Sequence, residues 1–162
     1  MTRIHYQSPD QRFGVSLPAD MMTRIRRVCH RAGTREVGGI LIGYYANGNH
    51  WAIVTQASEP PRNSRAGPRS FQRGTSGLQS WLDRLWGRGR YYLGEWHFHP
   101  FASPQPSDQD ITQMVAFANS PQFACPEPIL LIVGGDPQAL LQSSATVFPR
   151  LEKPIALTPI EA

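Results

Sequence analysis

The chain lacks the features of a secreted or membrane-spanning protein. Its 162 residues include only two cysteines, too few for a disulfide framework and not arranged as Cys-x-x-Cys. No stretch approaches the roughly 20 apolar residues of a membrane span, and the N-terminal segment carries charge and proline rather than an apolar signal. We therefore expect a cytoplasmic protein with no membrane partner. Cys29 and Cys125 are expected to be small buried residues.

Lysine is also nearly absent. Of the 16 lysine and arginine residues only Lys153 is a lysine, and the 12 acidic residues leave a formal net charge of +4. Seven arginines fall between residues 62 and 90, and a basic stretch can mark an acidic partner or a nucleic acid. We interpret this stretch as a solvated basic face, and we expect no nucleic-acid partner.

The hydrophobic pattern predicts an alternating order of helices and strands. Apolar residues recur at three- and four-residue intervals over residues 18–33, 78–87 and 111–118, which predicts helices. Apolar runs over residues 37–45, 51–57, 91–99, 128–133 and 145–148 predict strands, with 145–148 as the last. Asn47-Gly48-Asn49 predicts a tight hairpin turn, and the proline- and arginine-rich residues 58–70 predict a loop. We expect one α/β domain over residues 1–162, built around a mixed, curved sheet.

Two imidazoles, a hydroxyl and two carboxylates lie close together between residues 97 and 110. His97 and His99 alternate on the predicted strand, so their side chains point to the same face. Ser107 begins a predicted helix whose first turn carries Asp108 and Asp110. Two histidines and one aspartate, with the fourth position left to water, are the usual composition of a catalytic zinc site. Ser107-x-x-Asp110 is also typical of a capping box, which is compatible with a role in metal binding.

Two separated motifs resemble the JAMM (MPN+) signature of zinc isopeptidases. One is His97-x-His99-Pro with Ser107 and Asp110 at the family's spacing. The other is the upstream segment Glu36-Val37-Gly38-Gly39-Ile40-Leu41-Ile42-Gly43. The resemblance covers residues 13–150 and implies a single MPN/JAMM domain, with a mixed curved sheet flanked by helices in a cytidine-deaminase-like layout.

The resemblance also implies a role for each residue of the two motifs. It implies a zinc ion held by His97, His99 and Asp110. Glu36 is then the general base, which takes a proton as water attacks a carbonyl, and Ser107 stabilises the oxyanion.

Neighbouring residues leave alternatives open. Glu95 shares a face with the two histidines, so spacing alone allows it as the base, although a supporting contact to an imidazole or to the backbone is the preferred interpretation. Asp108 is an alternative ligand without the family's spacing. Phe98 departs from the small residue that the family more often has there, and we expect Phe98 or Phe71 to narrow a channel for the substrate.

The small size of the chain resembles the stand-alone bacterial deubiquitinase-like JAMM peptidases of anti-phage (CBASS-like) operons. The resemblance implies cleavage after the C-terminus of a ubiquitin-like protein. It implies as partners that protein or its conjugates, and ubiquitin-activating-like and ubiquitin-conjugating-like enzymes. The alternatives are a JAMM peptidase that releases a sulfur-carrier protein or small conjugate, and a metal-free MPN-type interaction module, which the intact ligand set argues against. The His-x-Glu and Pro-Cys-x-x-Cys signature of a zinc deaminase is missing.

Overall fold

The computed structural model describes residues 1–46, 48 and 50–161. The strands of its main sheet are β1 (Arg3–Gln7), β2 (Gly14–Pro18), β3 (Val37–Ala46), β4 (Trp51–Ala57), β7 (Tyr91–Pro100), β8 (Ile129–Gly135), β9 (Leu141–Val147) and β10 (Ile155–Ile160). The helices are α1 (Ala19–Ala32), α2 (Leu78–Trp86) and α3 (Asp108–Asn119). A separate two-stranded ribbon pairs β5 (Arg65–Ala66) with β6 (Phe71–Gln72).

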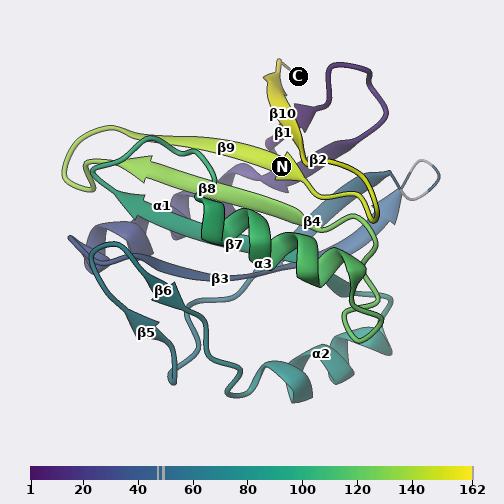
Figure 1. Ribbon diagram of the computed structural model, residues 1–162, viewed down its shortest axis with the longest axis horizontal. Coiled ribbons are helices and arrows are strands. Elements are labelled where there is room, and N and C mark those ends of the chain that lie inside the picture. The colour runs from purple at the N-terminus through teal and green to yellow at the C-terminus, as the bar shows by residue number, and fades with distance from the viewer. Residues whose placement is uncertain (47, 49, 162) are drawn as a thin grey trace.

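The main sheet closes into a barrel with the strand order β1-β10-β9-β8-β7-β3-β4-β2 (Figure 1). β7 lies between β3, its antiparallel neighbour, and β8, its parallel neighbour. A parallel pair needs a crossover connection, and α3 supplies it between β7 and β8. The sheet is therefore mixed, with β7 carrying a helix connection at its C-terminal end.

The helices pack on opposite faces of the central strands. Buried residues of α1 share one core with Trp96, Phe98 and inward-facing residues of β3 and β8. On the other face, α2 packs against β3 and β7, and α3 packs against β8. Figure 1 shows α3 lying across β7 and β8, with α2 and the β5–β6 ribbon next to that face. The face of β7 opposite Trp96 and Phe98 is the one that α2 and α3 flank.

The predicted mixed α/β class is confirmed, together with the three helices and the antiparallel β3–β4 hairpin. In the hairpin turn, Asn47 and Asn49 lie outside the described residues, and Gly48 has the positive φ of 71° that glycine tolerates. Residues 58–70 are mostly loop, as predicted, but include β5. Both cysteines are buried, as expected.

One prediction about the sheet was wrong: the segment 145–148 is not the last strand, because β10 follows it. The sheet also closes into a barrel through the pairing of β1 with β10, which the sequence did not predict. β1, β2 and β10 are five or six residues long, and Pro159 within β10 weakens its strand signal. Strands this short carry too weak a pattern to be predicted without their neighbours.

None of the helices in the described part of the chain is long and apolar enough to cross a membrane.

Candidate metal and catalytic site

Strand β7 positions two buried imidazoles. Trp96 and Phe98 are fully buried on the α1 face, so the pleat directs His97 and His99 to the opposite face. Both histidines are buried, with 6% and 8% of their surfaces exposed. Glycine is needed next to them in β3, because Gly38 pairs with His97 and a Cβ there would lie 2.8 Å from the imidazole ring. Two adjacent strands thus fix the place of the first histidine.

Helix α3 brings a carboxylate to these histidines. Its N-cap is a capping box, in which the Asp110 N–H donates to Ser107 Oγ (3.1 Å) and the Ser107 N–H donates to Asp110 Oδ2 (2.9 Å). The carboxylate held in this way lies 2.9 Å from His97 Nδ1 and 3.2 Å from His99 Nε2. One ligand atom from each residue lies within 4.8 Å of the others. Three residues predicted as ligands therefore converge in one buried cluster.

The charges in the cluster suit a cation. Burial would raise the pKa of Asp110, but hydrogen bonds with His97 and His99 hold that pKa well below its usual range. Burial lowers the pKa of His99, but the hydrogen bond and charge of Asp110 outweigh it, so the net pKa is raised. A carboxylate and two imidazole nitrogens form a donor set that fits a divalent ion such as zinc. The cluster is compatible with a metal site, although its ligand roles remain a prediction.

Glu36 lies beside this cluster, immediately before β3. Its backbone N–H donates to the Gly67 carbonyl oxygen (2.7 Å), which ties it to the loop of the β5–β6 ribbon. Its side chain is half-buried, and burial raises its pKa, while His99 and His97 lower that pKa and Asp110 raises it. A carboxylate with a raised pKa, close to a metal cluster, is suited to accept a proton. The structure thus brings the predicted base to the predicted ligands.

Ser107 occupies the exposed rim of the site. Its oxygen accepts the capping hydrogen bond from Asp110, and its own O–H can still donate to another group. Asp108, the alternative ligand, is exposed in the first turn of α3 and is outside the cluster. The geometry therefore favours Asp110 over Asp108.

Glu95, the alternative base, is engaged elsewhere. Its side chain is 2% exposed and accepts hydrogen bonds from Arg73 Nε (2.7 Å) and from the Tyr92 hydroxyl (2.9 Å). Burial raises the pKa of Glu95, although Arg73 lowers it. These partners differ from the imidazole or backbone contact that the sequence predicts. The sequence did not predict the contact of Arg73 with Glu95, because only the fold brings these residues, 22 positions apart, together.

The prediction for Phe98 was wrong, and that for Phe71 is compatible with the geometry. Phe98 is 0% exposed and packs in the α1 core, so it cannot narrow a channel beside the metal ligands. The Phe71 ring is next to His97, with ring centroids 6.0 Å apart and planes at 69°. The residue that borders the cluster therefore comes from the β5–β6 ribbon.

A pocket of about 520 Å³ adjoins the site along β7. Arg73, Tyr92 and Ile40 line it from the sheet side, and Leu78 and Trp86 line it from α2. We call it the α2 pocket. Because Arg73 also binds Glu95, two positions before His97, this pocket and the metal cluster share one face of β7.

Comparisons with known proteins agree with this geometry. Residues 18–145 match a family model described as prokaryotic homologs of the JAB domain. A CD-NTase/cGAS isopeptidase from Enterobacter hormaechei subsp. hoffmannii is 38% identical over 154 residues, which cover 95% of this chain and 86% of that protein. The probable metalloprotease y4qB from Sinorhizobium fredii is 27% identical over 84% of this chain and 90% of its own length.

A solved structure resembles the fold. The solution structure of protein DSY2949 from Desulfitobacterium hafniense has a TM-score of 0.62 and 18% identity, covering 90% of this chain and 88% of that one. At this identity the likeness concerns the fold alone.

Proposed function

The chain belongs to the family of prokaryotic JAB-domain homologs, and from this premise we propose that it is a zinc metallo-isopeptidase. Its relatives place it among isopeptidases and metalloproteases. In the proposed reaction it hydrolyses the peptide or isopeptide bond after the C-terminus of a ubiquitin-like protein. The observation that carries this proposal is the buried convergence of His97, His99 and Asp110, with Glu36 beside them.

In this proposal each residue of the cluster has one task. His97, His99 and Asp110 hold the zinc ion. When bound, zinc supplies Lewis acidity, which polarises the substrate carbonyl and lowers the pKa of a water molecule toward about 7. Glu36 accepts the proton of the attacking water, which its raised pKa favours, and then passes that proton to the leaving amine as the C–N bond breaks. The Ser107 hydroxyl donates to the oxyanion.

The β5–β6 ribbon supplies a place for the tail of the ubiquitin-like protein. It is a sheet of two strands, and an extended peptide can pair with an exposed strand edge. Phe71 at the end of this ribbon lies against His97. A small residue before the scissile bond would fit beside the Phe71 ring, whereas a bulky residue would clash with it. The arginines at residues 62–90 would steer an acidic protein body toward the site.

The relative from Enterobacter, named a CD-NTase/cGAS isopeptidase, supports a proposal for the protein to which the ubiquitin-like tail is attached. We infer that the ubiquitin-like tail is attached to an enzyme of the CD-NTase/cGAS type. The chain would then work in the cytoplasm, in a bacterial ubiquitin-like conjugation system of antiviral defence. Its other partners would be the ubiquitin-activating-like and ubiquitin-conjugating-like enzymes of that system.

A comparison of two tails tests the proposed activity. The zinc-loaded protein is given a cognate ubiquitin-like protein with a C-terminal extension, and the residue before the cleaved bond is either Gly or Leu. We expect fast cleavage after Gly, slow cleavage after Leu, little digestion of casein, and none of these activities in Glu36→Gln. Equal rates for the two tails, or faster digestion of casein, would refute the deconjugase assignment. Cleavage of small amino-acid conjugates alone would favour the small-conjugate alternative.

A further inference from the structure

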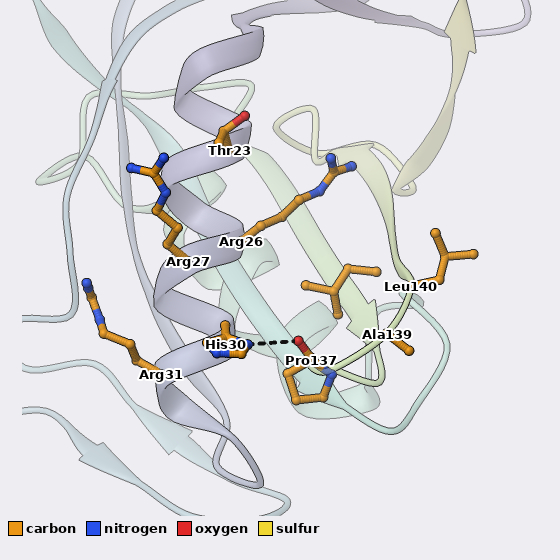
Figure 2. Close-up of a pocket in the computed structure, with 9 residues that line it drawn as sticks. Thr23, Arg26, Arg27, His30, Arg31, Pro137, Ala139 and Leu140 are labelled. Atoms are coloured by element: carbon orange, nitrogen blue, oxygen red, sulfur yellow. Dashed lines mark hydrogen bonds between the residues drawn. The ribbon is translucent and has the colours of Figure 1, made fainter.

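A second pocket lies on the face of the sheet that α1 covers. It has a volume of about 640 Å³ and lies between α1 and the loop from β8 to β9. Arg26, Arg27, His30 and Arg31 line it from the helix (Figure 2). The loop side is lined by Pro137, Ala139, Leu140 and Leu141. We call it the α1 pocket.

The helix side of the α1 pocket carries positive charge that the fold leaves unneutralised. On α1, Arg24 pairs with Asp20 (3.6 Å), and Arg31 pairs with Glu59 (3.3 Å). Throughout residues 1–46, 48 and 50–161, no carboxylate is paired with Arg26 or Arg27 within 4.0 Å. Both side chains are exposed. Figure 2 shows the Arg26 side chain directed toward the loop and the Arg27 side chain directed to the other side of α1, so the charge that faces the loop comes mainly from Arg26. A free guanidinium group there favours an anionic occupant.

The loop side is aliphatic. Leu140 is 73% exposed, which is high for an apolar side chain. It lies in the same pocket as four basic side chains. No Phe, Tyr or Trp is among the residues that line the pocket, and its one aromatic ring, the His30 imidazole, is held against the Pro137 carbonyl oxygen. Basic groups facing aliphatic groups fit a protein segment that carries both carboxylates and a leucine-like side chain.

The pocket is at the end of the barrel that holds the proposed active site. His30 Nδ1 lies 3.2 Å from the Pro137 carbonyl oxygen, which joins the two walls (Figure 2). Helix α1 ends at Ala32, and the chain reaches Glu36 four residues later. The loop on the other wall follows Gly134 and Gly135, which pair with His99 and Pro100. Both walls therefore continue directly into segments of the metal cluster.

We propose that the α1 pocket docks an acidic, leucine-bearing segment of the protein to which the ubiquitin-like tail is attached. This inference rests on the proposed function. The tail approaches along the β5–β6 ribbon on one face, and the attached protein leaves on the other side of the scissile bond. A docking site on the α1 face, at the same end of the barrel, would hold that second protein while its bond is cleaved. The pocket thus selects the target, whereas the ribbon selects the tail.

Binding is measured first, without catalysis. The full-length protein is titrated with a fluorescent peptide that repeats Glu-Glu-Leu, and with versions in which Gln replaces Glu or Ser replaces Leu. Wild-type protein should bind only the Glu-Glu-Leu peptide well. Arg26→Glu/Arg27→Glu should weaken binding by about tenfold, because reversal turns two attractions into repulsions. Leu140→Asp should weaken it as well.

Matched variants control for charge and for folding. Arg24→Glu/Arg150→Glu makes the same change in net charge on exposed residues outside the pocket. Leu151→Asp places the same substitution at a leucine that is 87% exposed elsewhere. Both controls should bind the peptide as wild type does. Equal weakening by the controls would overturn the proposal. So would binding of tripolyphosphate together with peptide binding that does not depend on leucine.

Cleavage of two substrates then connects the pocket to the proposed function. One is the ubiquitin-like protein conjugated to a CD-NTase-type target, and the other is the same protein carrying a coumarin amide. The ratio of their kcat/KM values should fall about tenfold in Arg26→Glu/Arg27→Glu and stay constant in the controls. Peptide binding by a protein that cleaves neither substrate would contradict the proposed function but not the docking site. Cleavage of both by a protein that does not bind the peptide would overturn the docking site alone.

Discussion

Replacing Arg73 by methionine should isolate a negative charge inside the protein. Arg73 and Glu95 form an ion pair at 2.7 Å, with only 12% and 2% of their side chains exposed. Methionine keeps much of the apolar stem of arginine, but it removes the only positively charged partner of Glu95 among the described residues. The Tyr92 hydroxyl then remains as the hydrogen-bond donor to the carboxylate.

The cost follows from how deeply the pair is buried. Breaking a buried ion pair by removing one partner costs about 3–5 kcal/mol, because an unpaired charge stays out of water. Since Tyr92 still donates one hydrogen bond, we expect Arg73→Met to lower the free energy of unfolding by about 3 kcal/mol. Adding Glu95→Gln removes the charge and keeps an acceptor for Tyr92. The double variant should therefore recover most of that loss.

Urea unfolding at neutral pH measures these values. Arg84→Met on α2 is the control, because Arg84 is exposed and its replacement should change stability by less than about 0.5 kcal/mol. Arg73 also ties the segment after β6 to β7, so Arg73→Met should raise KM more than it lowers kcat. A loss below about 1 kcal/mol, or no recovery in the double variant, would refute the view that the pair is desolvated.

Four further outcomes are expected. His97→Ala should lose the roughly one zinc per chain found in wild type by elemental analysis, and full retention would show that the ligand is misassigned. Glu36→Gln should keep zinc but slow turnover by a factor on the order of 10² to 10⁴, which single-substrate kinetics would reveal. Ser107→Ala should cost about 1 kcal/mol through the lost N-cap and slow turnover on the order of 10²-fold; a stability change alone would leave Ser107 only a capping role. Because burial raises the pKa of Cys29 to about 12 and that of Cys125 to about 11, neither should react with a thiol reagent at pH 8 until urea unfolds the chain.

Local patterns predicted most of the His97–His99–Asp110 cluster, and the resemblance to the family chose Asp110 over Asp108. The alternation of a strand brings His97 and His99 together, and a helix cap fixes the distance from Ser107 to Asp110. Both patterns involve only a few neighbouring residues, so they do not depend on contacts with distant parts of the chain. The same alternation also directs Phe98 to the face opposite the histidines, and the sequence therefore already contained the reason that its predicted role was wrong.

Contacts between distant segments could not be predicted in this way. The Arg73–Glu95 pair depends on how the chain from β6 to α2 passes under β7. The closure of the barrel depends on β1 meeting β10 at opposite ends of the sequence, and neither strand has a strong apolar pattern of its own. Pairing energy with a neighbour, rather than local preference, decides such elements.

The capping box of α3 has a consequence for tracing how members of such a family lose their chemistry. Ser107 and Asp110 satisfy each other's backbone N–H groups, so they stabilise the helix whether or not an ion is held. A descendant that abandoned hydrolysis could lose both imidazoles and still keep the two capping hydrogen bonds, because both partners belong to the start of α3. In a genomic survey, the Ser107–Asp110 pair is thus poor evidence that a protein is a catalytically active enzyme. The histidine pair on β7 is the better indicator, because it has no part in the capping hydrogen bonds.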